Sequence, residues 1–311
     1  MALRIHRRRF LGTSASGLAS LVILRDSRSA CAYSANEKLD VALVGVSGRG
    51  QWFVETVPRI GENVVALCDA NEKRAAAAFA RFPHVPKYQD FRKMLAKQAK
   101  QIDAVFVATP DHTHAVISAA AMRSGKHVYC EKPLTHDVRE ARALREIARQ
   151  QRVVTQMGNQ GTATEAFRRA VELIQGGALG RIKEIHVWNG GGTGPRKPPQ
   201  GSQSIPEGLD WDVWLGPAAE RPFHSQWLQW HTWRDFATGN AGNWGPHSAN
   251  LPFKAFQIDS LWHPDPAAKP LIRVHVQMSE IEQFAFPRWA SIRYEIPARG
   301  SLPPIEFNHY Y

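Results

Sequence analysis

A glycine-rich turn near the start of the chain is the first place where residue types and their spacing suggest chemistry. It follows an apolar run and consists of Gly45, Val46, Ser47, Gly48, Arg49 and Gly50. Glycines between a strand and a helix let the backbone turn tightly and approach an anion, and the helix offers unpaired N–H groups. The pattern indicates a pyrophosphate site, with Ser47 at the usual middle glycine, although alone it also fits an ordinary turn.

Asp69 strengthens the interpretation of a dinucleotide site. It ends the second apolar run of the chain, close to the spacing expected after such glycines. A carboxylate at that point accepts hydrogen bonds from both ribose hydroxyls and repels a 2′-phosphate. We therefore expect NAD as the cofactor in preference to NADP.

Two further motifs follow later apolar runs. Residues 108–114 read Ala-Thr-Pro-Asp-His-Thr-His, and residues 125–133 read Gly-Lys-His-Val-Tyr-Cys-Glu-Lys-Pro. Together with the glycine turn and the Gly-Asn-Gln sequence at 158–160, they resemble the glucose–fructose oxidoreductase/inositol dehydrogenase (Gfo/Idh/MocA) family of secreted bacterial oxidoreductases. The resemblance extends from about Leu39 to the end of the chain.

The resemblance implies that both motifs contact the cofactor. Thr109 and Pro110 would line it near the pyrophosphate and nicotinamide, and Asn159 would face its substrate side. The expected cofactor-binding residues are Gly45, Ser47, Gly48, Arg49, Gly50, Asp69, Thr109, Pro110, His112, His114, Glu131, Lys132, Pro133 and Asn159. His112 and His114 could also suggest zinc, but a zinc site needs three or four ligands. We expect no metal.

Three catalytic residues are also implied. Lys132, with Glu131 beside it and Pro133 often in a cis bond, would stabilise a developing alkoxide and relay a proton. Asn243 and His247 lie four residues apart, on one face of a helix expected from about Asn240. In the family pattern Asp stands at the first of these positions and His takes the proton. Because Asn cannot accept a proton at pH 7, His247 is the expected base.

The elements that must position these residues alternate along the first half of the chain. Strands are expected at 40–45, 64–68, 104–108, 127–130 and 153–156, and helices after the glycine turn and at 71–82, 90–100, 115–123 and 137–150. This alternation predicts an α/β fold with a doubly wound parallel sheet, the Rossmann form. A helix at 163–175 and strands at 182–188, 271–278, 289–296 and 304–309 then predict an α+β domain with an open, mostly antiparallel sheet.

The expected domains are a signal peptide at 1–32, an NAD(P)-binding Rossmann domain at 38–157 and a substrate and oligomerisation domain at 158–311. The first contains paired arginines before Phe10 and Leu11, a short apolar stretch and an A-x-A site ending at Ala32, a pattern that resembles a twin-arginine signal. It predicts export to the periplasm or beyond. A basic tail, or lipid attachment at Cys31, remains the alternative.

The last domain is expected to be truncated. Relatives continue for a further segment that completes the sheet, so a strand edge and an apolar face would be left exposed here. We expect a homo-oligomer to cover that face.

Composition excludes several classes of protein. The 311 residues carry a net charge of +11, of which six Arg and one Asp among residues 1–33 supply +5. The remaining surface is ordinary, so we expect no nucleic-acid partner, and no apolar run is long enough for an integral membrane segment. Cys68 and Cys130 end strands that lie about 14 Å apart in a Rossmann sheet, too far for a disulfide. We expect them to be buried thiols.

The predicted function is NAD-dependent hydride transfer to or from a hydroxyl of a sugar, sugar acid or cyclitol. One alternative is an NAD-dependent glycosidase of the same fold, which oxidises the sugar only transiently. Another is a non-catalytic relic that binds cofactor, because Asn243 and the shortened sheet both depart from the family pattern.

Overall fold

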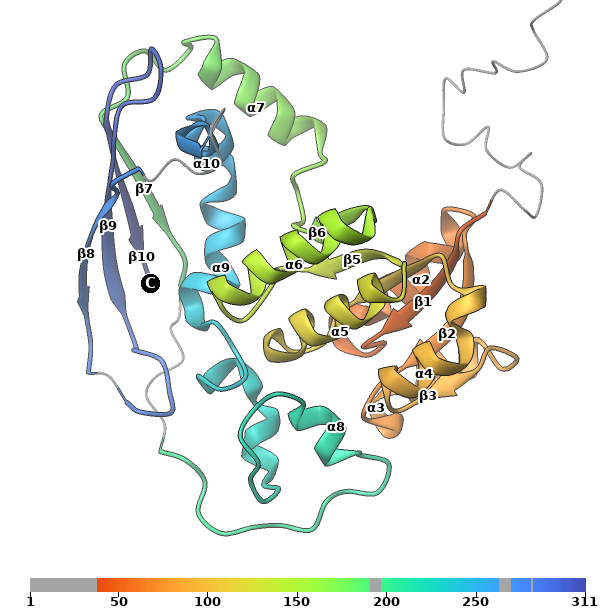
Figure 1. The fold of residues 1–311 in the computed structure, drawn as a ribbon. Helices are drawn as coiled ribbons and strands as arrows, with labels where there is room; N and C mark the ends of the chain where they lie inside the picture. The colour runs from red at the N-terminus through yellow and green to blue at the C-terminus, as the bar shows by residue number, and fades with distance from the viewer. Residues whose placement is uncertain (1–37, 191–196, 263–269, 281) are drawn as a thin grey trace, which may run out of the picture.

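The computed structural model describes residues 38–190, 197–262, 270–280 and 282–311. Figure 1 shows two sheets, one central to the N-terminal half of the chain and one at the opposite side of the molecule, with α9 and α10 between them. The predicted signal sequence, including Cys31, lies outside the described residues.

The N-terminal sheet is entirely parallel, with strand order β3-β2-β1-β4-β5-β6. Its strands are β1 (Asp40–Val44), β2 (Asn63–Cys68), β3 (Lys87–Tyr88), β4 (Ala104–Val107), β5 (His127–Glu131) and β6 (Thr155–Gly158). This order is that of a doubly wound Rossmann sheet, which confirms the predicted fold class. The two cysteines lie on β2 and β5, separated by two strands, and both are buried and free.

Helices cover both faces of this sheet. They are the 3₁₀ turn η3 (Gly48–Gly50), α2 (Gln51–Arg59), α3 (Glu72–Arg81), α4 (Phe91–Gln98), η4 (Ala99–Gln101), α5 (Asp111–Arg123) and α6 (Val138–Gln151). Side chains of Asn71, Asp90 and Asp137 cap α3, α4 and α6. Helix α5 begins four residues before its expected start, directly after Pro110, which brings His112 and His114 into its buried first turn.

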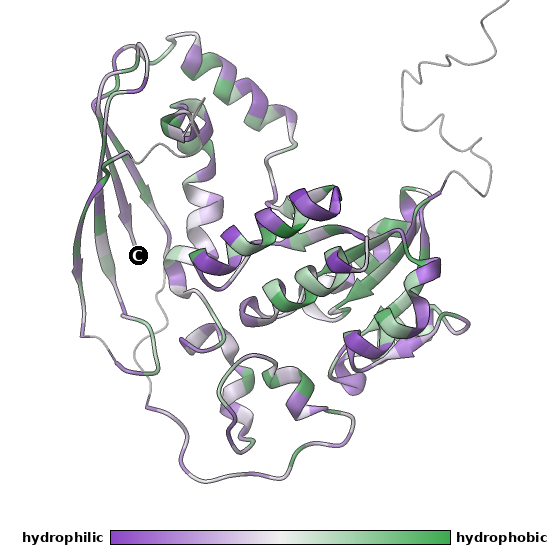
Figure 2. Ribbon diagram, in the orientation of Figure 1, coloured by the Kyte–Doolittle hydropathy of each residue, from purple (hydrophilic) through white to green (hydrophobic). Residues whose placement is uncertain are grey.

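The second sheet has the order β7-β10-β9-β8. Two of its three pairings are antiparallel, while β7 and β10 run parallel, so the expectation of a mostly antiparallel sheet is confirmed. The strands are β7 (Glu184–Trp188), β8 (Arg273–Met278), β9 (Ala290–Ile296) and β10 (Ile305–Tyr310). Figure 2 shows apolar and polar residues mixed along these strands, in contrast to the more uniformly apolar Rossmann strands.

The second half of the chain also forms several short helices. They are α7 (Glu165–Gln175), α8 (Trp211–Leu215), η5 (Ser225–Leu228), η6 (Trp230–Thr232), α9 (Gly239–Ser248), α10 (Asn250–Ala255) and η7 (Ile258–Trp262). An aromatic core around Trp211, Trp227, Trp233 and Phe236 holds the segment that includes α8 and η5. Among the described residues, no helix has the length and apolar character needed to cross a membrane.

Candidate functional site

The glycine turn is as tight as its sequence predicts. Gly45 has a φ of +78°, and a Cβ atom there would lie 2.6 Å from the carbonyl oxygen of Ala108. A Cβ atom on Gly50 would lie 1.7 Å from the carbonyl oxygen of Gly45. The turn therefore has room only for hydrogen at both positions, and it leads through η3 into α2. This backbone cradle at a helix start fits a pyrophosphate group.

Asp69 lies beside that turn, at the end of β2. Its carboxylate accepts hydrogen bonds from the backbone N–H of Val46 at 3.1 Å, from the Ser47 hydroxyl at 3.2 Å and from the N–H of Asn71 at 3.0 Å. These donors fix the carboxylate at the edge of the pocket, where it fits the ribose hydroxyls of a dinucleotide.

A pocket of about 490 Å³ joins this turn to the second domain. Its volume is within the range of small-molecule and cofactor sites. The predicted site residues that line it are Gly45, Ser47, Gly48, Arg49, Asp69, Thr109, Pro110, His114, Glu131, Lys132, Asn243 and His247. The structure thus brings together residues up to about two hundred positions apart in the sequence.

His114 connects the two loops that hold Thr109 and Lys132. Its buried ring contacts the carbonyl oxygen of Pro133 through Nδ1 at 2.7 Å and that of Thr109 through Nε2 at 2.8 Å. Both contacts require a donating N–H, so the ring is an imidazolium. Burial alone would lower the pKa of His114, but the neighbouring Cys130, Asp111 and Pro133 carbonyl raise it to about 9. We infer that His114 positions the loops around the cofactor pocket.

His112 lies in a different environment from His114. Its ring packs against Trp214 and Phe236, its Nε2 lies 3.0 Å from the Trp214 carbonyl oxygen, and it does not line the pocket. Burial lowers its pKa to about 4. Because side chains of a helix's first turn point in different directions, one histidine faces the pocket loops and the other the aromatic core.

Glu131 ends β5, and Lys132 follows it. Their charged side chains have different partners. The buried carboxylate of Glu131 forms an ion pair with Arg49 at 3.0 Å. The ammonium of Lys132 donates to the backbone oxygen of Asn243 at 2.9 Å and to its side-chain oxygen at 2.6 Å. Burial lowers the pKa of Lys132, and the carboxylates of Asp111 and Glu131 oppose that effect. The Lys132–Pro133 peptide bond is cis, as the resemblance implied.

Helix α9 supplies Asn243 and His247 to the same pocket. Asp111 accepts hydrogen bonds from the N–H and hydroxyl of Thr238 just before the helix, at 3.0 and 2.8 Å. The Asn159 amide donates to the carbonyl oxygen of Pro246 at 2.9 Å. Helix α9 continues through that proline to Ser248. Asn159 therefore holds the helix and does not line the pocket. Gly50 and Pro133 do not line it either. Gly50 packs against the backbone of Gly45, and the Pro133 carbonyl oxygen contacts His114.

The electrostatics of the pocket keep His247 neutral at pH 7. Burial lowers its pKa, and the positive charges of Lys132 and Arg49 lower it further. A neutral imidazole beside an ammonium can accept a proton, whereas the amide of Asn243 can only orient its neighbours. Among the described residues, no group of three or more His, Cys, Asp or Glu is placed to hold a metal ion.

Several residues that line the pocket were not among the predicted site residues. They include Asn71, Arg74, Gln160, Trp230 and His231. His231 lies in no recognisable motif and has an exposed side chain. It stacks on Trp230 at 3.5 Å between ring centroids, and desolvation lowers its pKa. Two tryptophans next to the aromatic core, Trp214 and Trp230, line the pocket. Trp211, Trp227 and Trp233 are buried in that core.

Comparison with known proteins agrees with this geometry. Residues 39–159 match the model of an oxidoreductase family with an NAD-binding Rossmann fold. The chain is 34% identical over 116 residues to a levoglucosan dehydrogenase of Pseudarthrobacter phenanthrenivorans, which is 37% of this chain and 29% of that protein. It is 33% identical over 146 residues to an inositol 2-dehydrogenase of Leifsonia xyli subsp. xyli, which is 45% and 42% of the two chains. The matches span less than half of these relatives.

Solved structures extend the similarity of fold to the second domain. GenD2 from gentamicin A biosynthesis, in complex with NAD, superposes with a TM-score of 0.62 at 21% identity, over 88% of this chain and 66% of that one. A levoglucosan dehydrogenase in complex with NADH gives 0.58 at 19% identity, over 88% and 67%. Both parts of the predicted architecture, including the NAD-binding Rossmann fold, are thereby confirmed.

Proposed function

We propose that this chain transfers hydride between a nicotinamide and a hydroxyl-bearing carbon of a sugar, sugar acid or cyclitol. The premise is that its residues 39–159 match the Gfo/Idh/MocA model of oxidoreductases with an NAD-binding Rossmann fold. The observation that carries the proposal is the single pocket lined at one end by the glycine turn and Asp69, and at the other by Lys132, Asn243 and His247. The named activities of relatives on levoglucosan and inositol support the substrate class.

When bound, the nicotinamide supplies a hydride acceptor or donor. The residues of this chain supply the proton chemistry. Neutral His247 takes the proton of the reacting hydroxyl, and the ammonium of Lys132 stabilises the alkoxide that develops there. Asn243 holds that ammonium through two oxygens, at 2.6 and 2.9 Å, and so fixes its direction.

Asp69 supports a preference for NAD. Its carboxylate is fixed beside the glycine turn by three donors. A 2′-phosphate at the same place would meet a negative charge, whereas ribose hydroxyls would donate to it. NADP is therefore the less favoured cofactor in this proposal.

A two-step experiment tests the function. Titration of the purified chain with NAD and NADP comes first, followed by absorbance at the NADH band with a panel of sugars, sugar acids and cyclitols. We expect NAD binding and NADH formation with at least one compound of the panel. NAD binding without any turnover would favour the cofactor-binding relic, and cleavage of a glycoside without net NADH would favour the glycosidase.

We propose in addition that the protein is exported through the twin-arginine pathway. The basis is the sequence alone, with its paired arginines, apolar stretch and A-x-A site. Exported protein should begin near Tyr33, and replacing Arg7 and Arg8 together by Lys should retain it in the cytoplasm. Cytoplasmic protein that still carries Met1 or Ala2 would overturn this proposal.

The proposed homo-oligomer has a structural basis in β8. All six residues of this edge strand are exposed, including Val274, Val276 and Met278. An exposed apolar edge strand favours pairing with another chain. Light scattering coupled to size exclusion measures the mass, and a monomer at micromolar concentration would contradict the proposal.

A further inference from the structure

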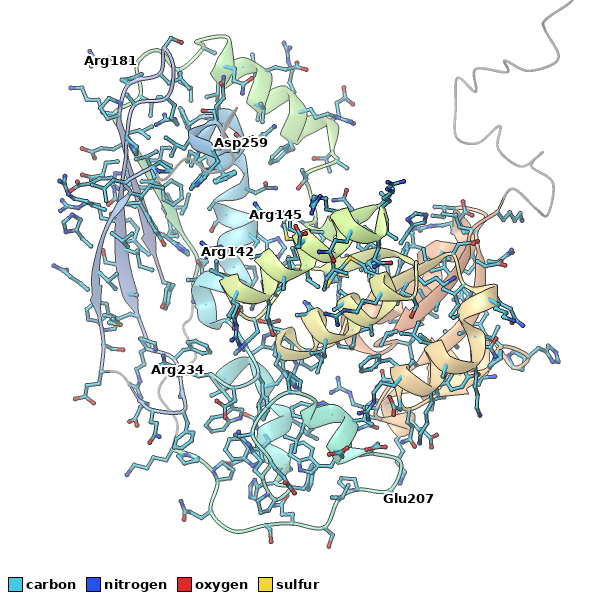
Figure 3. All side chains as sticks on the ribbon, viewed as in Figure 1. Arg142, Arg145, Arg181, Glu207, Arg234 and Asp259 are labelled. Atoms are coloured by element: carbon cyan, nitrogen blue, oxygen red, sulfur yellow. The ribbon has the colours of Figure 1, made fainter. Side chains whose placement is uncertain are left out.

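A segment of the second domain crosses over the Rossmann domain at the end of β2. We call residues 205–216, which include α8, the strap. Figure 1 shows the chain running from the second sheet along one side of the molecule to α8, close to α3, and Figure 3 places Glu207 at that crossing. The strap is thus far from its own sheet and belongs spatially to the cofactor domain.

Backbone groups attach the strap to the residues that follow Asp69. The N–H of Asp210 donates to the carbonyl oxygen of Ala70 at 2.9 Å, and the N–H of Glu72 donates to that of Gly208 at 2.8 Å. Asn71 and Leu209 form an antiparallel bridge between these two contacts. The strap is therefore aligned with the connection between β2 and α3 over several residues.

Two side-chain contacts add to this attachment. The amide of Gln89 also donates to the Gly208 carbonyl oxygen, at 3.1 Å. Lys73 and Glu207 form an ion pair at 3.0 Å in which both side chains are mostly exposed. An exposed pair of this kind adds little stability, so at residues 70–73 the strap is held mainly by backbone hydrogen bonds. Further along, its Trp214 is held against His112 of α5.

The inner side of the strap faces the pocket. Val213, Trp214 and Gly216 line it, as do Phe91 and Val116 of the Rossmann domain. Gly216 approaches α5 so closely that a Cβ atom there would lie 3.0 Å from the Thr113 methyl group. The indole of Trp214 is fixed by stacking on Trp211, at 5.0 Å between ring centroids. The result is an apolar slot between two domains.

The residues around this slot indicate which part of a dinucleotide it could hold. Asp69 marks the ribose next to the glycine turn, and Lys132 marks the nicotinamide end of the pocket. The strap residues share this pocket with Asn71 and Arg74, which follow Asp69 in the chain. We infer that the base that continues from the ribose lies between them. Apolar and aromatic walls are the surroundings that a purine ring prefers.

We propose that the strap forms the outer wall of the adenosine half of the NAD site, with Trp214 against the base, and that the cofactor enters and leaves only when the strap separates from residues 70–72. The proposal rests on NAD binding in the proposed function. It assigns to the second domain a role in holding the cofactor that is separate from the substrate chemistry on α9.

A reversible lock tests whether the strap must open. Partners in an antiparallel bridge have Cα atoms about 4.5–5.5 Å apart, which is within disulfide range. The variant with Asn71→Cys and Leu209→Cys is loaded with NADH and oxidised, and release into excess NAD is followed by nicotinamide fluorescence. We expect release to slow by about tenfold or more, as for a closed lid, and to recover on reduction. Equal release rates before and after oxidation would overturn the proposal.

The control for this lock is the unmodified chain carried through the same oxidation and reduction. Its described cysteines, Cys68 and Cys130, are buried and lie on separated strands. Comparing the oxidised and reduced forms of one variant cancels the effect of losing the Asn71 side chain, which caps α3.

Ligand fragments test the adenosine wall directly. In Trp214→Ala, affinity for ADP-ribose should fall by about tenfold, the usual loss for a base–aromatic contact, while affinity for nicotinamide mononucleotide should not change. The matched control is Trp289→Ala, which removes an exposed indole outside the pocket. Unchanged ADP-ribose affinity in a folded Trp214→Ala chain would refute the wall. If the unmodified chain binds neither NAD nor ADP-ribose, the proposed function itself fails.

Discussion

The two sheets of this molecule differ in how far their strands are buried. The pocket differs in the same way between its cofactor end, at the glycine turn and Asp69, and its substrate end, at Lys132, Asn243 and His247. In β1 of the Rossmann sheet four of five residues are buried, whereas in β8 of the second sheet all six are exposed. Helices lie on both faces of a parallel sheet because each crossover must return over it. The cofactor end of the pocket is thus supported by a complete core.

The substrate end depends on contacts between domains. Helix α9 is held by Lys132, by Asp111 through Thr238, and by Asn159 through Pro246. These are polar contacts of single side chains, and each can be removed without opening the Rossmann core. Changes at the cofactor end should therefore act mainly through fold and affinity, and changes on α9 mainly through the chemical step.

Gly50→Ala should give the largest effect and tests the cofactor end. The new Cβ atom would lie 1.7 Å from the carbonyl oxygen of Gly45, which is backbone and cannot move aside cheaply. We expect loss of NAD binding and destabilisation by about 3 kcal/mol, the upper range for overpacking. Thermal unfolding and NAD titration measure both. The control is Gly190→Ala, where no atom lies within 4 Å of the new Cβ. Normal NAD binding by Gly50→Ala would contradict the tight turn.

His247→Ala should act on chemistry alone. We expect kcat to fall by about 10²–10⁴, the usual contribution of a general base, with NAD affinity unchanged. His275→Ala, on the exposed β8, serves as the control. A fully active His247→Ala chain would leave Lys132 as the proton carrier.

The pH profile of the unmodified chain tests the same residue. Protonated His247 cannot accept a proton, so kcat/KM should fall as the pH drops through its pKa. Burial, Lys132 and Arg49 hold that pKa below the ordinary 6.5. The acid limb should therefore lie below pH 6.5 and be absent from the residual activity of His247→Ala. A limb well above 6.5 would assign the base to another group.

The cofactor end could be predicted in detail because its signals are local. The glycine turn, Asp69 and the alternating strands fix the Rossmann sheet from short-range spacing alone, and the structure agrees to within a few residues at most element ends. Helix α5 is an exception. Its start was expected at Ala115, since periodicity counts apolar residues and cannot recognise His112, Thr113 and His114 as buried groups with carbonyl and hydroxyl partners.

The substrate end was predictable only through the resemblance. The contact between Lys132 and Asn243 joins residues 111 positions apart, and no spacing rule reaches that far. His231 and helix α10 gave no recognisable pattern, because their places are set by packing between domains. Which aromatic residues line the pocket likewise depends on tertiary structure.

Asp69→Ala should produce a smaller loss at the cofactor end. Removing a charged acceptor is worth about 1.5–3 kcal/mol, or about ten- to over a hundredfold in NAD affinity. Asp69→Asn is the matched variant, because it keeps an oxygen for the Val46 and Ser47 donors and removes the charge that repels a 2′-phosphate. In both variants the gap between NAD and NADP should narrow in titrations. Equal affinity of the unmodified chain for both cofactors would refute the role of Asp69.

Asn243→Asp should give the smallest change, and it separates electrostatics from positioning at the substrate end. The side-chain oxygen of Asn243 already accepts from Lys132 at 2.6 Å, so a carboxylate would keep that contact and add a negative charge. The charge raises the pKa of both Lys132 and His247, because it favours their protonated forms. It also stabilises the imidazolium that forms when His247 takes the proton. Desolvation of a half-buried pair limits the gain, and we expect kcat to rise by less than about tenfold.

The pH profile distinguishes this gain from a general improvement in packing. In Asn243→Asp the acid limb of kcat/KM should move to higher pH. In Asn243→Ala, which leaves the Lys132 ammonium only the backbone oxygen of residue 243 as partner, kcat should fall. Steady-state rates of the three proteins with one active substrate, from pH 5 to 8, give both quantities. If both the acid limb and kcat are unchanged in Asn243→Asp, a charge at residue 243 does not act on the reacting proton. The effect of Asn243 would then come from its hydrogen bonds to Lys132 alone.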